Sequence, residues 1–188
     1  MAPVWVTVLV GLASGVVGTL LSTLLRISHE RAAELRSRML EAADDYVRAL
    51  DEAGRLADEA GLPQVSASFF THEGELASDK AAAAESAREA AVTALRTVEG
   101  FRSRIRLLYG PDSSASNHAE RAYEKVAEAV AELFRFHTDD SSDDIDIENE
   151  RRDKFLSILR AHIDEAHDAL DEFSRDARAA MSRSRMAS

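Results

Sequence analysis

The sequence predicts an all-α protein in which a single N-terminal transmembrane helix continues into an antiparallel four-helix bundle with coiled-coil-like packing. Residues 3–25 lack charge, apolar residues recur at helical spacing through most of the remaining chain, and no segment alternates as a strand does. We expect a bundle domain at 26–183, with helices near 27–60, 75–109, 117–137 and 147–183, and a disordered tail at 184–188.

The uncharged stretch is long enough to cross a bilayer. As a helix, residues 3–25 would extend about 34 Å, against about 30 Å for a hydrocarbon core. A cleaved secretory signal and a buried helix of a soluble domain are the alternatives, but no basic side chain precedes the stretch and it is too long for a signal. Arginines follow it, so the positive-inside rule predicts a single-pass cell-membrane protein with its N-terminus outside and its C-terminal domain cytoplasmic.

Small residues share one face of this expected span. Close backbone approach at such positions favours transmembrane self-association, and we therefore expect a homo-oligomer. The alternative is that glycine is simply common in membrane helices. The residues concerned are Gly11, Gly15, Gly18 and Ser22.

Composition excludes several classes of function. The chain has no cysteine, so it can form neither a disulfide nor a thiolate metal site. Its net charge of −11 argues against nucleic acid as a partner, because binding to nucleic acid requires a basic face. Arginine greatly exceeds lysine and alanine is abundant, which is typical of a high-GC bacterial genome.

The first bundle helix is expected to continue from the N-terminal stretch as one rod and to end at Gly61 and Pro63. We expect Phe69 and Phe70, in a loop at 61–74, to cap the core, with a partner-docking patch as the alternative. Two rows of apolar residues define its inner face: Leu35, Met39, Ala42, Tyr46, Ala49, Ala53, Leu56 and Ala60, and beside them Leu40, Ala43, Val47, Leu50 and Ala57.

The second and third helices have a row of mostly apolar positions at spacings of three and four, broken in the second helix only by Lys80. In the second helix this heptad pattern predicts left-handed packing at about +20°, and Tyr109-Gly110-Pro111 ends the helix. Asn117, with Glu120, is expected to cap the third helix. The apolar positions are Ala77, Ala84, Ala87, Ala91, Ala94, Val98, Phe101, Ile105 and Leu108, then Ala119, Tyr123, Val126, Val130, Leu133 and His137.

Residues 139–150 carry seven acidic side chains and no basic one. A calcium loop needs a glycine at its turn and a closing glutamate, and this segment supplies neither in register. We interpret it as a solvated loop whose last acids favour the start of the fourth helix. The apolar residues that share one face of that helix, here called its apolar stripe, are Phe155, Leu159, Ile163, Ala166, Leu170, Phe173, Ala177 and Ala180.

Antiparallel helices would gather arginines at the membrane-proximal end of the bundle. Anionic lipids attract such side chains, so we expect contact with lipid headgroups; the alternative is that cations merely suit helix C-termini. The candidates are Arg26, Arg31, Arg102, Arg106, Arg178 and Arg183.

No motif indicates catalysis, a cofactor or a metal. His162 and His167 are five positions apart, whereas two zinc ligands on one helix face are four apart. We therefore expect no enzyme, with a metal-dependent bundle enzyme as the least favoured class. The leading function is a membrane-anchored interaction or scaffold protein whose partners are the lipid bilayer and an unidentified protein. The alternative is a membrane-perturbing effector, of lysis or defence type, that acts by assembly of transmembrane helices.

Overall fold

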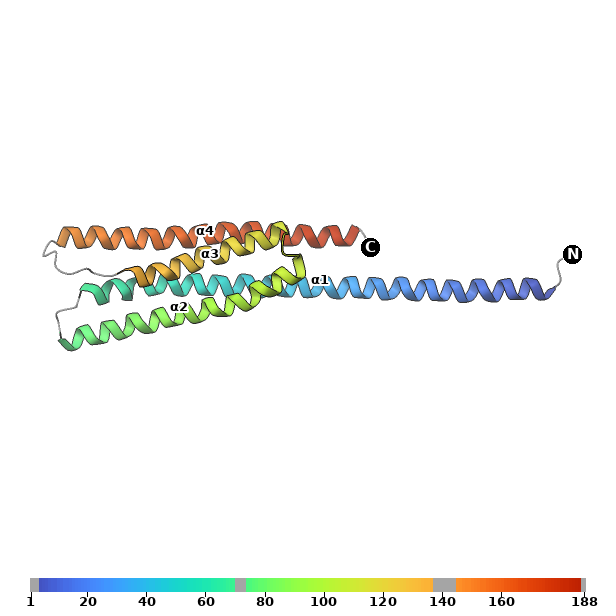
Figure 1. Ribbon diagram of the computed structural model, residues 1–188, viewed down its shortest axis with the longest axis horizontal. Helices are drawn as coiled ribbons and strands as arrows, with labels where there is room; N and C mark the ends of the chain where they lie inside the picture. The colour runs from blue at the N-terminus through green and yellow to red at the C-terminus, as the bar shows by residue number, and fades with distance from the viewer. Residues whose placement is uncertain (1–3, 70–73, 137–144, 187–188) are drawn as a thin grey trace.

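The computed structural model describes the backbone of residues 4–69, 74–136 and 145–186, and the side chains of residues 26–67, 78–136 and 149–182. This part of the chain contains four α-helices and no strand: α1 (Val4–Phe69), α2 (Gly74–Tyr109), α3 (Ser114–Arg135) and α4 (Ile145–Met186). Consecutive helices run antiparallel and α1 continues beyond the other three (Figure 1). The expected all-α helical bundle is confirmed.

The expected transmembrane placement is corrected. Among the described residues, no helix is both long enough and apolar enough to cross a membrane. α1 has 66 residues, so it meets the length requirement for crossing a membrane. A span needs about 20 consecutive apolar residues, and in the part of α1 whose side chains are described, charged residues recur in every turn from Arg26 to Glu59. A single-pass protein with an outside N-terminus and a cytoplasmic domain is therefore not supported.

The apolar stripes of the sequence do form the core. In α2, one set of heptad positions is buried and the other half-buried, as expected for a helix that contacts two neighbours. In α4, every stripe position from Phe155 to Ala177 is buried. The largest fully buried side chains come from all four helices: Tyr46, Leu50, Val98, Ile105, Val126, Leu133, Leu159 and Phe173.

α1 and α3, although diagonal to one another in the bundle, are in contact. α1 contacts each of the other helices, whereas α2 and α4 barely meet. Both helices contribute buried alanines to the core, among them Ala53 and Ala122, and such small side chains allow neighbouring backbones to approach. The buried Tyr46 hydroxyl donates to the Ala119 carbonyl at 2.5 Å, and its ring meets Phe173 edge-on with centroids 5.4 Å apart.

Helix α1 does not end at Gly61 and Pro63, contrary to expectation, but runs to Phe69 with Pro63 inside it. Proline removes one backbone hydrogen bond, but tertiary contacts hold this segment against its neighbours. A Cβ on Gly61 would lie 2.8 Å from Leu159 Cδ2, so this glycine permits α4 to approach closely. One turn later the Gln64 side chain donates to the Phe136 carbonyl at 3.3 Å.

The cap of α3 also differs from expectation. Ser113, not Asn117, is the N-cap, and its side chain accepts from the Ser116 amide at 3.1 Å. Asn117 lies within the first turns of α3, where its amide donates to the Ser113 carbonyl. Gly110 has φ +92°, a left-handed conformation that ends α2 and that glycine adopts without strain.

Some expectations fall outside the described residues: the core-capping role of Phe69 and Phe70, and the acidic residues 139–144. α4 begins at Ile145 and continues to Met186, into the expected tail. Leu35 and Leu40, expected in the core, are 48% and 47% exposed. Leu35 lies one turn before Met39, beside which α2 ends, and the Met39 carbonyl accepts from the Tyr109 hydroxyl at 2.9 Å.

We expect Tyr46→Phe to lower the free energy of unfolding by about 1 kcal/mol, because it removes a fully buried hydrogen bond. Tyr109→Phe should lower the free energy of unfolding by less, because the Tyr109 side chain is only partly buried and water can replace part of its hydrogen bond to Met39. Urea denaturation of both variants measures the difference. Equal stability losses would contradict the central role of the α1–α3 contact.

The same change at two glycines should have opposite effects. Gly100→Ala should stabilise by up to about 1 kcal/mol, because Gly100 is in mid-helix and a Cβ there meets nothing within 4 Å. Gly110→Ala should destabilise by about 1 kcal/mol, because its positive φ strains an L side chain. Urea midpoints of the two variants test both signs.

Burial, and to a lesser degree Asp44, raises the pKa of Tyr109 from 10.0 to about 12. The unfolded chain therefore loses this proton first, and stability should decline as pH rises from about 10 towards 12. Tyr109→Phe should remove that part of the alkaline decline. Urea unfolding at several alkaline pH values measures it, and an unchanged slope in the variant would contradict the assignment.

Candidate functional site

The contact between α3 and α4, here called the α3–α4 seam, is lined by polar side chains that pair across it. Near the start of α3, His118 Nδ1 lies 2.9 Å from a Glu172 carboxylate oxygen, and His118 Nε2 lies 3.5 Å from Asp176. The Ser114 hydroxyl also donates to Asp176. The imidazole thus sits between two carboxylates of α4 and fixes the register of the two helices.

A second group of charges follows two turns later on the α3–α4 seam. The Lys125 ammonium donates to Glu128 at 2.8 Å and lies 2.9 Å from Glu165, while His162 Nδ1 lies 3.2 Å from Glu128. The hydrogen bond from Lys125 lowers the pKa of Glu165. The bonds to Glu128 and Glu165 raise the pKa of Lys125. Both shifts favour the charged forms of this exposed pair, which links α3 to α4.

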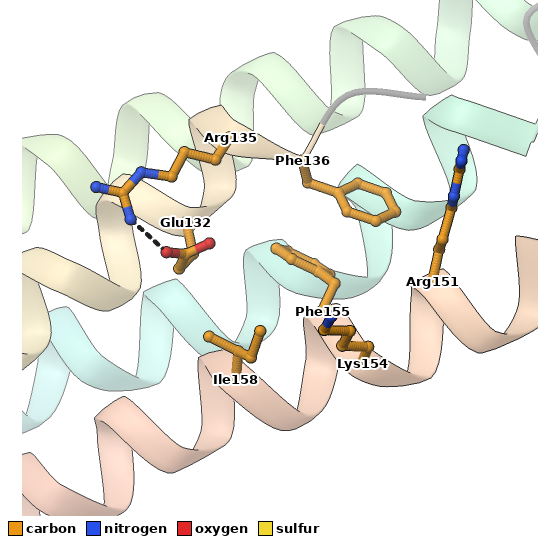
Figure 2. A pocket seen from close by; sticks show the side chains of 7 residues that line it. All are labelled: Glu132, Arg135, Phe136, Arg151, Lys154, Phe155 and Ile158. Atoms are coloured by element: carbon orange, nitrogen blue, oxygen red, sulfur yellow. Dashed lines mark hydrogen bonds and ion pairs between the residues drawn. The ribbon is translucent and has the colours of Figure 1, made fainter. Parts of the chain in front are cut away.

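The α3–α4 seam ends in a pocket of about 270 Å³ at the C-terminal end of α3 (Figure 2). We call this cavity the seam pocket. Three of its lining residues come from α3 and the adjoining C-cap, and four come from the first half of α4. They are Glu132, Arg135 and Phe136, and Arg151, Lys154, Phe155 and Ile158.

Aromatic rings form the floor of the seam pocket. The Phe136 and Phe155 rings lie with centroids 4.3 Å apart and planes tilted by 31°. Phe155 is buried, whereas Ile158, one turn further along α4, is 36% exposed. In Figure 2 the two rings face each other at the centre, and Ile158 extends the apolar floor along α4.

Charged side chains form the rim. Arg135 Nη1 lies 2.5 Å from Glu132 Oε1 on the same helix. Arg151 and Lys154 are exposed on α4, and within the described residues neither has an ion-pair partner. Three cations and one carboxylate give the seam pocket a net charge of +2 in a chain of net charge −11.

The seam pocket is lined by aromatic, aliphatic and charged side chains. Its seven residues include no hydroxyl, imidazole or thiol group, and the carboxylate is held in an ion pair. The volume also lies just under the roughly 300–1,000 Å³ of pockets that enclose a whole small molecule. An aromatic floor of this size fits one large side chain of a ligand.

A second hollow lies on the opposite flank of α3, between α3 and α2, and has a different charge balance. Its volume is about 280 Å³, and its lining pairs two glutamates with two arginines around Phe134. Arg88 is bonded to Glu85 there and lies 5.3 Å from the centroid of the Phe134 ring. Because its charges are internally matched, this hollow is the weaker candidate for an ionic ligand.

The small-residue face expected in a span, Gly11, Gly15, Gly18 and Ser22, belongs to the part of α1 whose side chains are not described. Of the arginines expected at lipid headgroups, Arg26 pairs with Glu30 at 2.9 Å. Arg102 pairs with Glu120 at 3.3 Å and lies over the Tyr123 ring. Arg31, Arg106 and Arg178 are exposed, and the side chain of Arg183 is not described. The expected contact of these arginines with lipid headgroups depended on the membrane placement, which is not supported.

The histidines of α4 take part in contacts between helices. His162 contacts Glu128 of α3, and His167 Nε2 lies 3.9 Å from Asp51 of α1. Within the described part of the chain, no three or more His, Asp or Glu side chains are grouped so as to hold a metal ion.

Reasoning from sequence did not find the seam pocket. Phe155 was expected only as a core residue, and Phe136 was not singled out, although it lies next to the last predicted apolar position of the third helix. The available signal was the order Arg151-Arg152-Asp153-Lys154-Phe155, which places cations around an apolar position at the start of a helix. That signal does not reveal what lies opposite.

Comparisons of the chain with protein-family models, with curated proteins and with solved structures gave no match.

Proposed function

We propose that this chain is a non-enzymatic helical interaction or scaffold protein that receives a partner protein at the seam pocket. The observation that carries the proposal is the exposed pocket with an aromatic floor and an unbalanced cationic rim. Protein interfaces favour such sites, because an aromatic or aliphatic anchor buried in a small pocket contributes most of the binding energy and arginine is enriched around it.

The architecture supports this role. The core is closed by four helices of one chain, so the seam pocket is not needed to complete the fold. The polar groups of the α3–α4 seam are engaged with one another, and they hold the two pocket walls in a fixed register. A rigid, preformed pocket binds with a smaller loss of conformational entropy than a pocket that must be ordered.

The membrane-perturbing effector considered from the sequence is not proposed. Its mechanism required assembly of membrane-spanning helices, and among the described residues no helix is able to span.

We expect a photoreactive p-benzoylphenylalanine in place of Ala161 to crosslink to one discrete protein in the cells that make this chain. Ala161 is exposed and lies one turn beyond Ile158, on the same face of α4, so the pocket itself stays intact. Ala90, an exposed alanine of α2 outside the seam pocket, is the matched control. Adducts are identified by mass spectrometry.

Two results would contradict the proposal: no adduct from the Ala161 position, or the same adducts from both positions. Circular dichroism of both substituted proteins checks that they remain helical, so that a negative result reports on the surface and not on unfolding.

A further inference from the structure

The charges along the α3–α4 seam follow one rule until the seam pocket is reached. A base on one helix faces an acid on the other: His118 faces Glu172 and Asp176, Lys125 faces Glu165, and His162 faces Glu128. Each contact matches opposite charges or a hydrogen-bonding pair, so this arrangement stabilises the packing of the two helices.

The rule breaks at the seam pocket. There Arg135 of α3 shares the pocket with Arg151 and Lys154 of α4, and the one carboxylate, Glu132, is bonded to Arg135 on its own helix. Like charges around a shared cavity repel one another and do not hold α3 and α4 together. Within the described residues, Arg151 and Lys154 are thus left without a partner on the facing helix.

The floor adds a second requirement. The exposed part of Ile158 and the pair formed by Phe136 and Phe155 offer an apolar surface that water covers in the free protein. Burying a large apolar side chain fully is worth about 1.5–3 kcal/mol. A ligand that carries only negative charge would leave that surface wet.

We infer that the seam pocket recognises an acidic segment of a partner protein that inserts one aromatic or aliphatic side chain against Phe136, Phe155 and Ile158. Carboxylates flanking that anchor pair with Arg135, Arg151 and Lys154. This inference names the partner chemistry and rests on the proposed function. Charge complementarity selects the occupant, since a basic or neutral segment would leave two exposed cations uncompensated.

Nucleic acid fits less well than an acidic peptide. A duplex requires a row of phosphate contacts, whereas a patch of net +2 on a chain of net charge −11 supplies few of them. A short DNA duplex nevertheless belongs in the test as a competing polyanion.

The test measures binding of fluorescein-labelled short peptides to the full chain by fluorescence anisotropy. The first probe has a single phenylalanine flanked by aspartate and glutamate residues. The second replaces its phenylalanine with serine, and the third replaces its acids with the corresponding amides. The first probe should bind, and the affinity of each of the other two should be lower by a factor of roughly ten or more. Added salt should weaken binding of the first probe, because its rim contacts are exposed.

Two double variants supply the matched comparison. Arg151→Gln with Lys154→Gln removes the unpaired rim cations and should lower the affinity for the first probe by roughly tenfold. Arg175→Gln with Arg178→Gln removes two cations at the same spacing near the other end of α4 and should leave binding unchanged. These residues are all exposed on α4, so all variants should remain folded.

The inference is overturned if the amide probe binds as well as the acidic probe, if both double variants behave alike, or if no acidic probe binds up to about 1 mM. It is also overturned if the DNA duplex binds as tightly as the first probe, or if the chain self-associates through the same cations in sedimentation experiments. Failure here, together with a discrete adduct from the Ala161 position, would leave the proposed function standing and reject only the acidic chemistry. Loss of that adduct would reject the proposed function itself.

Discussion

The contact between α1 and α3 distinguishes the packing of this bundle, because the other diagonal pair, α2 and α4, barely meets. Four packed helices can share a square cross-section, or one diagonal can shorten while the other lengthens. Here α1 and α3 are in contact, whereas α2 and α4 barely meet, and both α1 and α3 contribute buried alanines to the core. The hydrogen bond from Tyr46 to the Ala119 carbonyl secures this diagonal at a buried point where a mismatch would leave a hydroxyl without a partner.

This arrangement places α3 in contact with all three other helices, and its limited length then determines where the surface is open. α3 ends at Arg135, whereas α4 begins at Ile145 and passes beside that end. The chain at Phe136 turns out of the helix with φ −73° and ψ 93°, and its ring packs on Phe155. The seam pocket is therefore a consequence of a helix end beside a continuing helix, held in place because Gln64 of α1 donates to the Phe136 carbonyl.

Sequence reasoning recovered the fold where periodicity is determined by burial and failed where tertiary contacts override local signals. The stripes of α2 and α4 are in the core because their spacing admits only one inward face. α1 continues past Pro63, where Gly61 permits the close approach of α4 and Gln64 donates to the Phe136 carbonyl at the end of α3. Leu35 has the correct spacing for the core but lies beyond the end of α2, and spacing alone carries no information on where a neighbouring helix stops.

The seam pocket was beyond such reasoning for a related cause. Arg151 and Lys154 read as ordinary surface charges, and only the register set by His118 and Lys125 across the α3–α4 seam shows that they share a cavity with Arg135. Local rules that a sequence otherwise obeys tend to be broken at functional sites. Along the rest of the α3–α4 seam, basic side chains face acidic ones. At the seam pocket, by contrast, three cations surround an aromatic floor in a chain that is acidic overall. Like charges oppose one another there, so this cluster does not stabilise the contact between α3 and α4, and the proposed carboxylate-bearing ligand would supply the opposite charge.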